Sequence, residues 1–168
     1  MADKPIQLVS GILTQVEAKI ASAGAADSGR VVALDTAGKI DLSMMPVGVV
    51  ADVKLIIASE AIGSGKYVNI FNNAGTANIR LADNSNGRTA HGFLLTGVAI
   101  AGTGTVYFEG PNNGLTALTA GSRQFLATAG GVTATAPVFP AASISQLVGV
   151  AISATEINTD IDDAIALA

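Results

Sequence analysis

YVNIFNNAGTANIRLA, residues 67–82, is the stretch that decides the fold class of this chain. Residues 67–71 and 77–82 are strand-like runs, and the turn between them, 72–75, holds Asn and Gly, which tolerate positive φ at little steric cost. Comparable runs bounded by turn residues occur at 47–58, 92–100 and 105–109, and in the second half at 124–127, 132–136 and 145–153. Short strands with regular turns predict a mainly β protein, either a compact β-sandwich or a small β-barrel of short antiparallel strands.

The two halves of this β region share a short repeat. The tetrapeptide Gly-Val-Ala-Ile occurs at 97–100 and again at 149–152, and the preceding hairpin turns, at 74–75 and 129–130, keep nearly the same offset. A duplication would divide the β domain, residues 47–158, into two similar hairpin modules at about 58–110 and 115–157. Chance recurrence of four common residues is the alternative, and the sequence leaves both open.

Residues 1–46 are predicted to form a short helix followed by an extended arm. Apolar side chains recur there at intervals of three and four residues, as on one helix face or in the a and d seam of a coiled coil. These residues are Ile6, Val9, Leu13, Val16 and Ile20. Together with Met44 and Met45 in the arm, they are the residues that we expect to contact another copy or a larger assembly. Only two heptads are present, so a helix that lies on its own domain is the alternative.

The C-terminal segment, residues 159–168, is predicted to be either a short helix or a disordered tail. Thr159 can cap a helix whose first turn holds Asp162 and Asp163, where carboxylates suit the positive end of the helix dipole.

Charge is scarce and unevenly distributed. Charged residues make up 13% of the chain, against about 25% in typical soluble domains, and none occurs from Gln124 to Thr155. This uncharged stretch is not a membrane span, because Gly130, Pro137 and Pro140 interrupt it and Ser and Thr recur through it. We therefore expect the second half to be covered by copies of itself or by a larger lattice.

Composition also excludes several classes of partner and chemistry. The net charge is −4 and the nine Lys and Arg residues are scattered, so nucleic acid is not an expected partner, and neither is a membrane. Cysteine is absent, which excludes disulfides, thiolate nucleophiles and Cys-ligated zinc. The first residues lack a basic region followed by an apolar one, so no secretory signal is expected.

Motifs for catalysis are weak. The run Gly63–Lys66 lacks the first Gly and the final Ser or Thr of a phosphate-binding loop, and His91 has no nucleophile or orienting group that the sequence reveals. The acidic trio Asp160, Asp162 and Asp163 lacks the turn Gly and the distal Glu of an EF-hand. We therefore expect no catalytic residues, no metal site and no cofactor.

Much of the chain resembles structural proteins of tailed bacteriophages. The resemblance begins with LDTAGKIDLSMMPVG (34–48), SEAIGSGKYVNIFNNAGTANIRLAD (59–83) and AHGFLLTGVA (90–99). It continues in TVYFEGPNNGLTALTAGSRQFLATAGGVTATAP (105–137) and LVGVAISATEI (147–157), and in total covers roughly residues 28–157. These segments look like a domain of capsid decoration (cement) proteins and of tail-fibre-like proteins. The motifs are turns and strand edges, and they carry over no catalytic residue.

The resemblance implies a virion protein that is assembled in the cytoplasm of a bacterial host. A compact β domain with a short arm favours a decoration protein on the capsid surface, bound to the major capsid protein and self-associated as a dimer or trimer. A tail-fibre or baseplate component is the alternative in the same class. A small glycan-binding or glycan-acting module is the alternative in another class, although few aromatics and no paired carboxylates argue against it.

Overall fold

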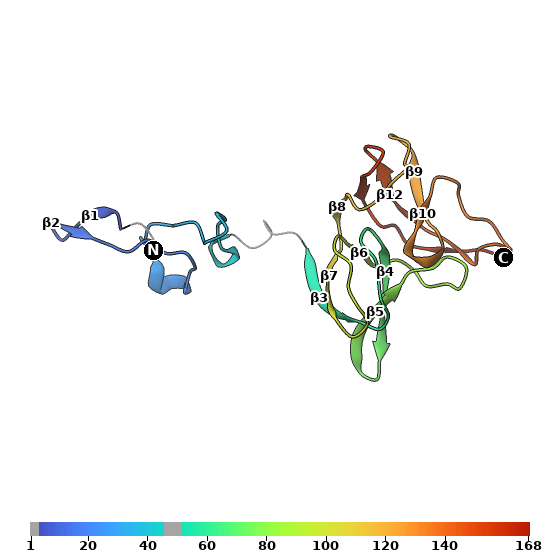
Figure 1. Cartoon of the computed structure of the whole chain (residues 1–168), viewed down its shortest axis with the longest axis horizontal. Helices are drawn as coiled ribbons and strands as arrows, with labels where there is room; N and C mark the ends of the chain where they lie inside the picture. Colours follow the sequence, from blue (N-terminus) through green and yellow to red (C-terminus); the bar gives the residue numbers. More distant parts are fainter. Residues whose placement is uncertain (1–3, 46–51) are drawn as a thin grey trace. The chain divides into compact units, whose positions relative to one another are not determined.

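The computed structural model describes residues 4–45 and 52–168 and divides the chain into two compact units, Met1–Val50 and Ala51–Ala168 (Figure 1). The start of the strand predicted at 47–58 and the predicted boundary between residues 46 and 47 lie outside the described residues. No helix among the described residues is long and apolar enough to cross a membrane.

The N-terminal unit begins with a hairpin of two short strands, β1 (Ile6–Val9) and β2 (Ile12–Gln15), which pair antiparallel. The prediction of a helix here is wrong. Ser10 and Gly11 have φ values of 51° and 81°, which form a two-residue turn of the kind that joins strands and that no helix contains. The β-branched residues Ile6, Val9 and Ile12 suit the strands on either side.

After β2, the described residues of this unit are mostly irregular, with two short 3₁₀ turns, η1 (Gly24–Asp27) and η2 (Leu42–Met44). Polar contacts hold it: Asp27 accepts the backbone N–H of Ala23 at 2.7 Å and lies 3.4 Å from the Lys19 ammonium. Among the described side chains of residues 4–45, Ala18 is the only apolar one that is buried. The described part of this unit therefore has no hydrophobic core of its own.

The second unit begins with a closed barrel of five strands, in the order β3-β5-β4-β6-β7. The strands are β3 (Val53–Ala58), β4 (Tyr67–Asn73), β5 (Thr76–Leu81), β6 (Gly92–Leu94) and β7 (Thr103–Tyr107). The β4–β5 hairpin is the one predicted from residues 67–82. Inside the barrel the buried side chains are aliphatic: Ile56, Ala58, Ile62, Val68, Ile79, Leu94 and Val106.

The mainly β class and a small barrel were predicted, but the expectation of antiparallel strands throughout is wrong. β3 and β5 run parallel, with Ile57 opposite Asn78 and Ala58 opposite Ile79. The reason is geometric: a closed ring of five strands cannot alternate in direction at every step, so one pair must be parallel.

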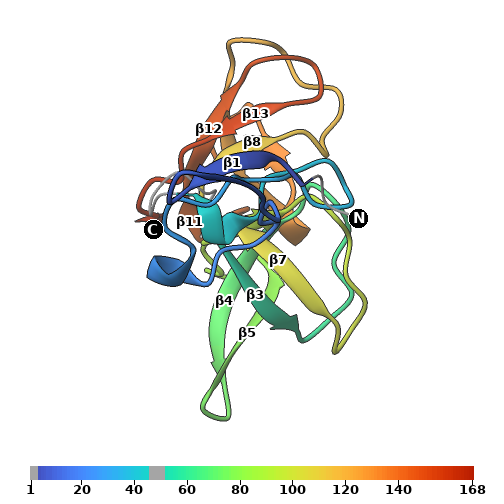
Figure 2. The ribbon, with the colours of Figure 1, turned by 90° about the vertical axis from the view of Figure 1, so that its left-hand side faces the viewer.

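A second sheet follows in the order β10-β9-β12-β13-β8 and is open. Its strands are β8 (Gly110–Asn112), β9 (Arg123–Leu126), β10 (Val132–Thr133), β12 (Leu147–Ala151) and β13 (Ile157–Thr159), and the turn η3 (Thr128–Gly130) joins β9 to β10. The strands of this sheet and those of the barrel occupy opposite ends of the second unit (Figures 1 and 2).

The barrel and the open sheet share one strand order. Read from β5, the barrel runs β5-β4-β6-β7-β3, and the open sheet runs β10-β9-β12-β13-β8, each with a hairpin at one end and the earliest strand at the other. In the repeated tetrapeptide, Val98 pairs with Ile62, which precedes β4, and Val150 pairs with Arg123, the first residue of β9.

A second core joins the barrel to the open sheet. Tyr67 and Phe93, from the barrel, are fully buried against Leu126, Ile144 and Val148, from the second half. The Tyr67 and Phe93 ring centroids lie 5.9 Å apart, and the Tyr67 hydroxyl is 3.0 Å from the Thr159 hydroxyl. Burial raises the pKa of Tyr67, although its hydroxyl partner opposes this shift.

The C-terminal segment is a strand-forming extension of the second unit. β14 (Ile165–Ala166) pairs antiparallel with β11 (Ile144–Ser145), and no helix forms in residues 159–168. The helix alternative fails because Ile161 and Ala164 pack against the second core, which favours extended chain over a capped turn.

Candidate functional site

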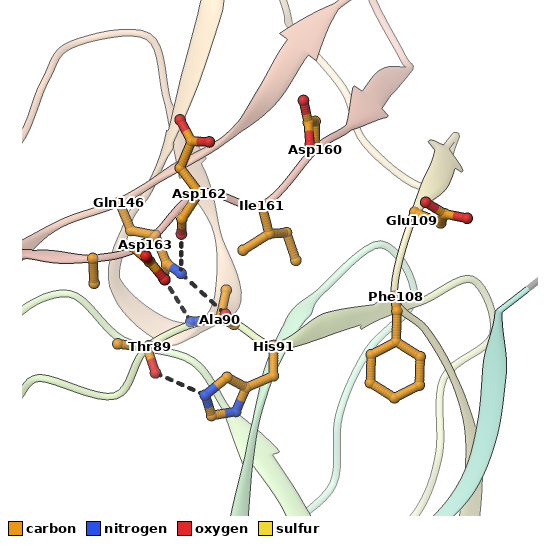
Figure 3. A pocket seen from close by; sticks show the side chains of 11 residues that line it. Thr89, Ala90, His91, Phe108, Glu109, Gln146, Asp160, Ile161, Asp162 and Asp163 are labelled. Carbon is orange, nitrogen blue, oxygen red and sulfur yellow. Dashed lines mark hydrogen bonds between the residues drawn. The ribbon is translucent and has the colours of Figure 1, made fainter.

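An open pocket of about 510 Å³ lies in the second unit where the C-terminal segment passes the barrel (Figure 3). Glu109, Asp160, Asp162 and Asp163 give it an acidic rim. The other lining residues come from just before β6, just after β7, the position before β12 and the C-terminal extension: Thr89, Ala90, His91, Phe108, Gln146, Ile161 and Ala164. This pocket brings together His91 and the acidic trio that the sequence analysis had considered separately.

The geometry of His91 opposes a role as general base. Its Nδ1 accepts the backbone N–H of Ile70 at 2.9 Å, so Nδ1 carries no proton. Nε2 then carries the proton and donates it to the Thr89 hydroxyl at 3.0 Å (Figure 3). Partial burial lowers the pKa of His91, which also favours this neutral form. Both ring nitrogens are therefore engaged, and neither offers a lone pair to a substrate.

Gln146 is a buried polar residue beside this pocket, and its hydrogen bonds within the chain account for its burial. Its side-chain amide accepts the N–H of Ala90 at 2.7 Å and donates to the carbonyls of Ala90 and Asp162 at 3.1 and 3.0 Å (Figure 3). These bonds fasten the C-terminal extension to the barrel. Within residues 4–45 and 52–168, no three His, Asp or Glu side chains are grouped to hold a metal ion.

The second candidate site is the surface of the β1–β2 hairpin, defined here as residues 6–15. Leu8 lies opposite Leu13 and Val9 lies opposite Ile12, so both faces of the hairpin are apolar. One face presents Ile6, Leu8 and Leu13, which are 70%, 69% and 75% exposed. No charged residue occurs from Pro5 to Val16. Because the N-terminal unit does not bury these side chains itself, the hairpin is a surface suited to a partner.

The predicted contact residues are distributed differently from the helix seam expected of them. Ile6 and Leu13 share one face of the hairpin, whereas Val9 lies on the other. The remaining predicted residues lie outside the hairpin: Val16 and Ile20 follow β2, half-buried and exposed respectively, and Met44 and Met45, at and after η2, are half-buried. The structure thus brings three of the seven predicted residues into one short hairpin.

The sequence analysis did not count Leu8 and Ile12 among the contact residues, although both widen the same apolar stripe, and it missed the hairpin that exposes them. The sequence feature that indicates the hairpin is the dipeptide Ser10-Gly11 between two short strand-like runs, which is typical of a two-residue hairpin turn. The three-and-four spacing concealed it, because a short apolar run fits either period.

Much of the uncharged stretch from Gln124 to Thr155 packs within the chain itself. Leu126, Ile144 and Val148 are buried in the second core, which accounts for much of the missing charge. The large apolar side chains of this stretch that stay exposed are Val138, Phe139, Val150 and Ile152. Its burial between chains stays a prediction.

Comparison of the chain with protein-family models, with curated proteins and with solved structures finds no match.

Proposed function

We propose that this protein is a structural virion protein, a capsid decoration (cement) protein that binds the outer surface of a phage head and stabilises the contacts between capsomers. It acts by binding alone, and its partners are the major capsid protein and further copies of itself. The resemblance of residues 28–157 to phage structural proteins supports this proposal.

The observation that carries the proposal is the contrast between residues 4–45, which have no core, and the well-packed second unit. The hairpin exposes uncharged aliphatic side chains at 46–75%, and isolated two-stranded hairpins are at best marginally stable in water. Covering this surface gives binding energy at low cost to the rest of the fold, because the second unit has cores of its own.

The mechanism follows from mass action. A protein that binds only the assembled shell stabilises it by RT ln(1 + [L]/Kd) for each site, and a capsid offers many sites. No bond is made or broken. The engaged ring nitrogens of His91 fit a protein that acts without catalysis.

Deleting the gene and measuring heat inactivation and adsorption tests this proposal. We expect capsids to form, to rupture at a lower temperature or under milder osmotic shock, and to adsorb to cells normally. An adsorption defect with unchanged shell stability would instead identify a tail-fibre or baseplate component.

Adding purified protein back to the deficient capsids identifies the binding surface. Leu8→Asp with Leu13→Asp places two charges on the hairpin face and should abolish protection. Ile165→Asp, at an equally exposed aliphatic residue of the second unit, is the matched control and should protect like the wild type. Equal protection by all three proteins would show that the hairpin does not bind the shell.

A further inference from the structure

The outer edge of β1 carries backbone groups that have no partner within the hairpin. Val16 donates its N–H to the carbonyl of Pro5 at 3.0 Å, which makes Pro5 and Val16 a hydrogen-bonded pair. Such pairs alternate along an antiparallel ladder, so Gln7–Thr14 and Val9–Ile12 are also bonded. The N–H and C=O groups of Ile6 and Leu8 therefore point away from β2, and those of Leu13 and Gln15 point away from β1.

These edges lack the features that protect exposed strands from pairing with another chain. Natural edges are protected by charged side chains, prolines or bulges, whereas residues 6–15 contain no charge, no proline and no register shift. Pro5 lies just outside, and its ring nitrogen faces Val16 rather than the outer edge. Pairing along this edge buries no charged side chain of residues 6–15. A strand that matches the edge is therefore also uncharged and aliphatic.

From this geometry we infer that β1 pairs with β1 of a second copy, antiparallel and centred on Gln7, to form one four-stranded sheet from two hairpins. In this register Ile6 of each copy exchanges both backbone hydrogen bonds with Leu8 of the other. The outward N–H and C=O groups of one β1 edge thus form hydrogen bonds with those of the other, and the contact has two-fold symmetry.

The side chains select β1 over β2 for this contact. Pairing through β1 places Ile6 beside Leu8 of the second copy, aliphatic against aliphatic, on the face that already holds Leu13. Pairing through β2 would place the Gln15 amide beside Leu13 instead. A sheet of four strands is also more stable than an isolated two-stranded hairpin, which is at best marginally stable in water.

This inference rests on the self-association part of the proposed function and not on the capsid. It is tested in solution with the full chain, so its failure and a failure of capsid protection are separate results. The absence of cysteine allows a single-cysteine experiment. Across the two-fold axis the two Gln7 residues form a non-hydrogen-bonded pair, with Cα atoms about 4.5 Å apart, within reach of a disulfide.

Gln7→Cys is the test variant and Thr14→Cys, directly opposite on β2, is the matched control. The two Thr14 residues would be separated by three strand spacings, about 14 Å, which no disulfide spans. Under mild oxidation we expect Gln7→Cys to form a linked dimer at least about tenfold faster than Thr14→Cys, because pairing raises the effective thiol concentration to the millimolar range. Equal rates, or faster linking through Thr14→Cys, would overturn the assignment.

A second pair of variants tests the backbone directly. Leu8→Pro and Leu13→Pro each remove one leucine and one outward N–H, from β1 and β2 respectively, and spare the internal ladder. Light scattering over a concentration series should give a dimer for the wild type and Leu13→Pro, and a monomer for Leu8→Pro. A wild type that is monomeric up to about 1 mM, the weak limit of specific association, overturns the inference, as does a Leu8→Pro dimer of wild-type strength. Binding to capsids without any Gln7→Cys dimer would assign the edge to another protein.

Discussion

Both units of this protein are rich in aliphatic residues, but only the second unit buries them. In residues 52–168, two cores enclose aliphatic and aromatic side chains, whereas in the described part of residues 4–45 Ala18 is the one buried apolar side chain. The difference teaches that apolar composition alone does not distinguish a core from a binding surface. Burial follows from strands that close around a volume, and a two-stranded hairpin cannot enclose one.

The largest effect should come from the core that joins the barrel to the open sheet. Phe93 is fully buried between Tyr67 and Tyr107, so Phe93→Ala should lower the free energy of unfolding by about 3–5 kcal/mol. Leu13→Ala, at a residue 75% exposed in the hairpin, should change it by less than about 0.5 kcal/mol. Denaturant unfolding of monomeric protein measures both. A comparable loss at Leu13 would show that the hairpin is part of a core.

Two glycines test the contrast between the packed second unit and the N-terminal unit at the level of the backbone. Gly65 and Gly38 both have φ of 72°, but a Cβ at Gly65 would collide with the backbone of Gly114, whereas nothing lies within 4 Å of one at Gly38. Gly65→Ala should cost about 3 kcal/mol or more through this collision, and Gly38→Ala about 1–2 kcal/mol of local strain only. Thermal unfolding of the second unit should respond to the first change and not to the second.

Two aspartates with the same local motif provide a smaller test, which depends on pH. Asp83 and Asp41 each accept the N–H and the hydroxyl of the serine two residues later, at 2.9 and 2.6 Å. Only Asp83 also accepts the N–H of Ala129, at 3.1 Å, which ties the barrel to the second half. Partial burial raises the pKa of Asp83, but these hydrogen bonds outweigh it and leave the pKa below its usual value.

A lowered carboxyl pKa stabilises the folded state above the unfolded pKa of about 3.9, and the stabilisation is lost as pH falls through the lower, folded pKa. Asp83→Asn should therefore lower stability by about 1 kcal/mol near neutral pH and flatten the decline below about pH 4. Asp41→Asn is the control and should leave unfolding of the second unit unchanged. Chemical denaturation at several pH values would contradict this prediction if both variants behaved alike.

The smallest effect concerns His91, the only histidine of the chain. Because partial burial lowers its folded pKa, the unfolded chain binds a proton first as pH falls. Stability should be complete above about pH 6.5 and decrease as pH falls from there to the folded pKa. His91→Asn should remove this slope, since Asn can still accept the Ile70 N–H. An unchanged slope in the variant would refute the neutral assignment.

Local sequence predicted the parts of the fold that depend on short-range chemistry. The hairpin of β4 and β5 formed at the predicted turn, where Ala74 and Gly75 take positive φ and the Asn72 side chain accepts the Gly75 N–H. The mainly β class followed from runs of this kind. The N-terminal hairpin was missed, although Ser10-Gly11 encodes its turn in the same way. Apolar spacing over so few residues fits a helix as well as a strand, so the spacing alone predicted the wrong element. Ile6, Val9 and Leu13 were therefore expected on one helix face, whereas the structure exposes them in a hairpin, and their contact with a partner stays a prediction.

The sequence by itself determined a mainly β chain with scarce charge and no cysteine, because turn residues and composition act locally. Only the tertiary structure decided which apolar side chains are core and which are surface. Barrel closure by the parallel pair of β3 and β5, and the shared core of Tyr67, Phe93 and Leu126, join residues far apart in the chain. Contacts between such distant residues depend on how whole strands pack together, and no local pattern specifies them.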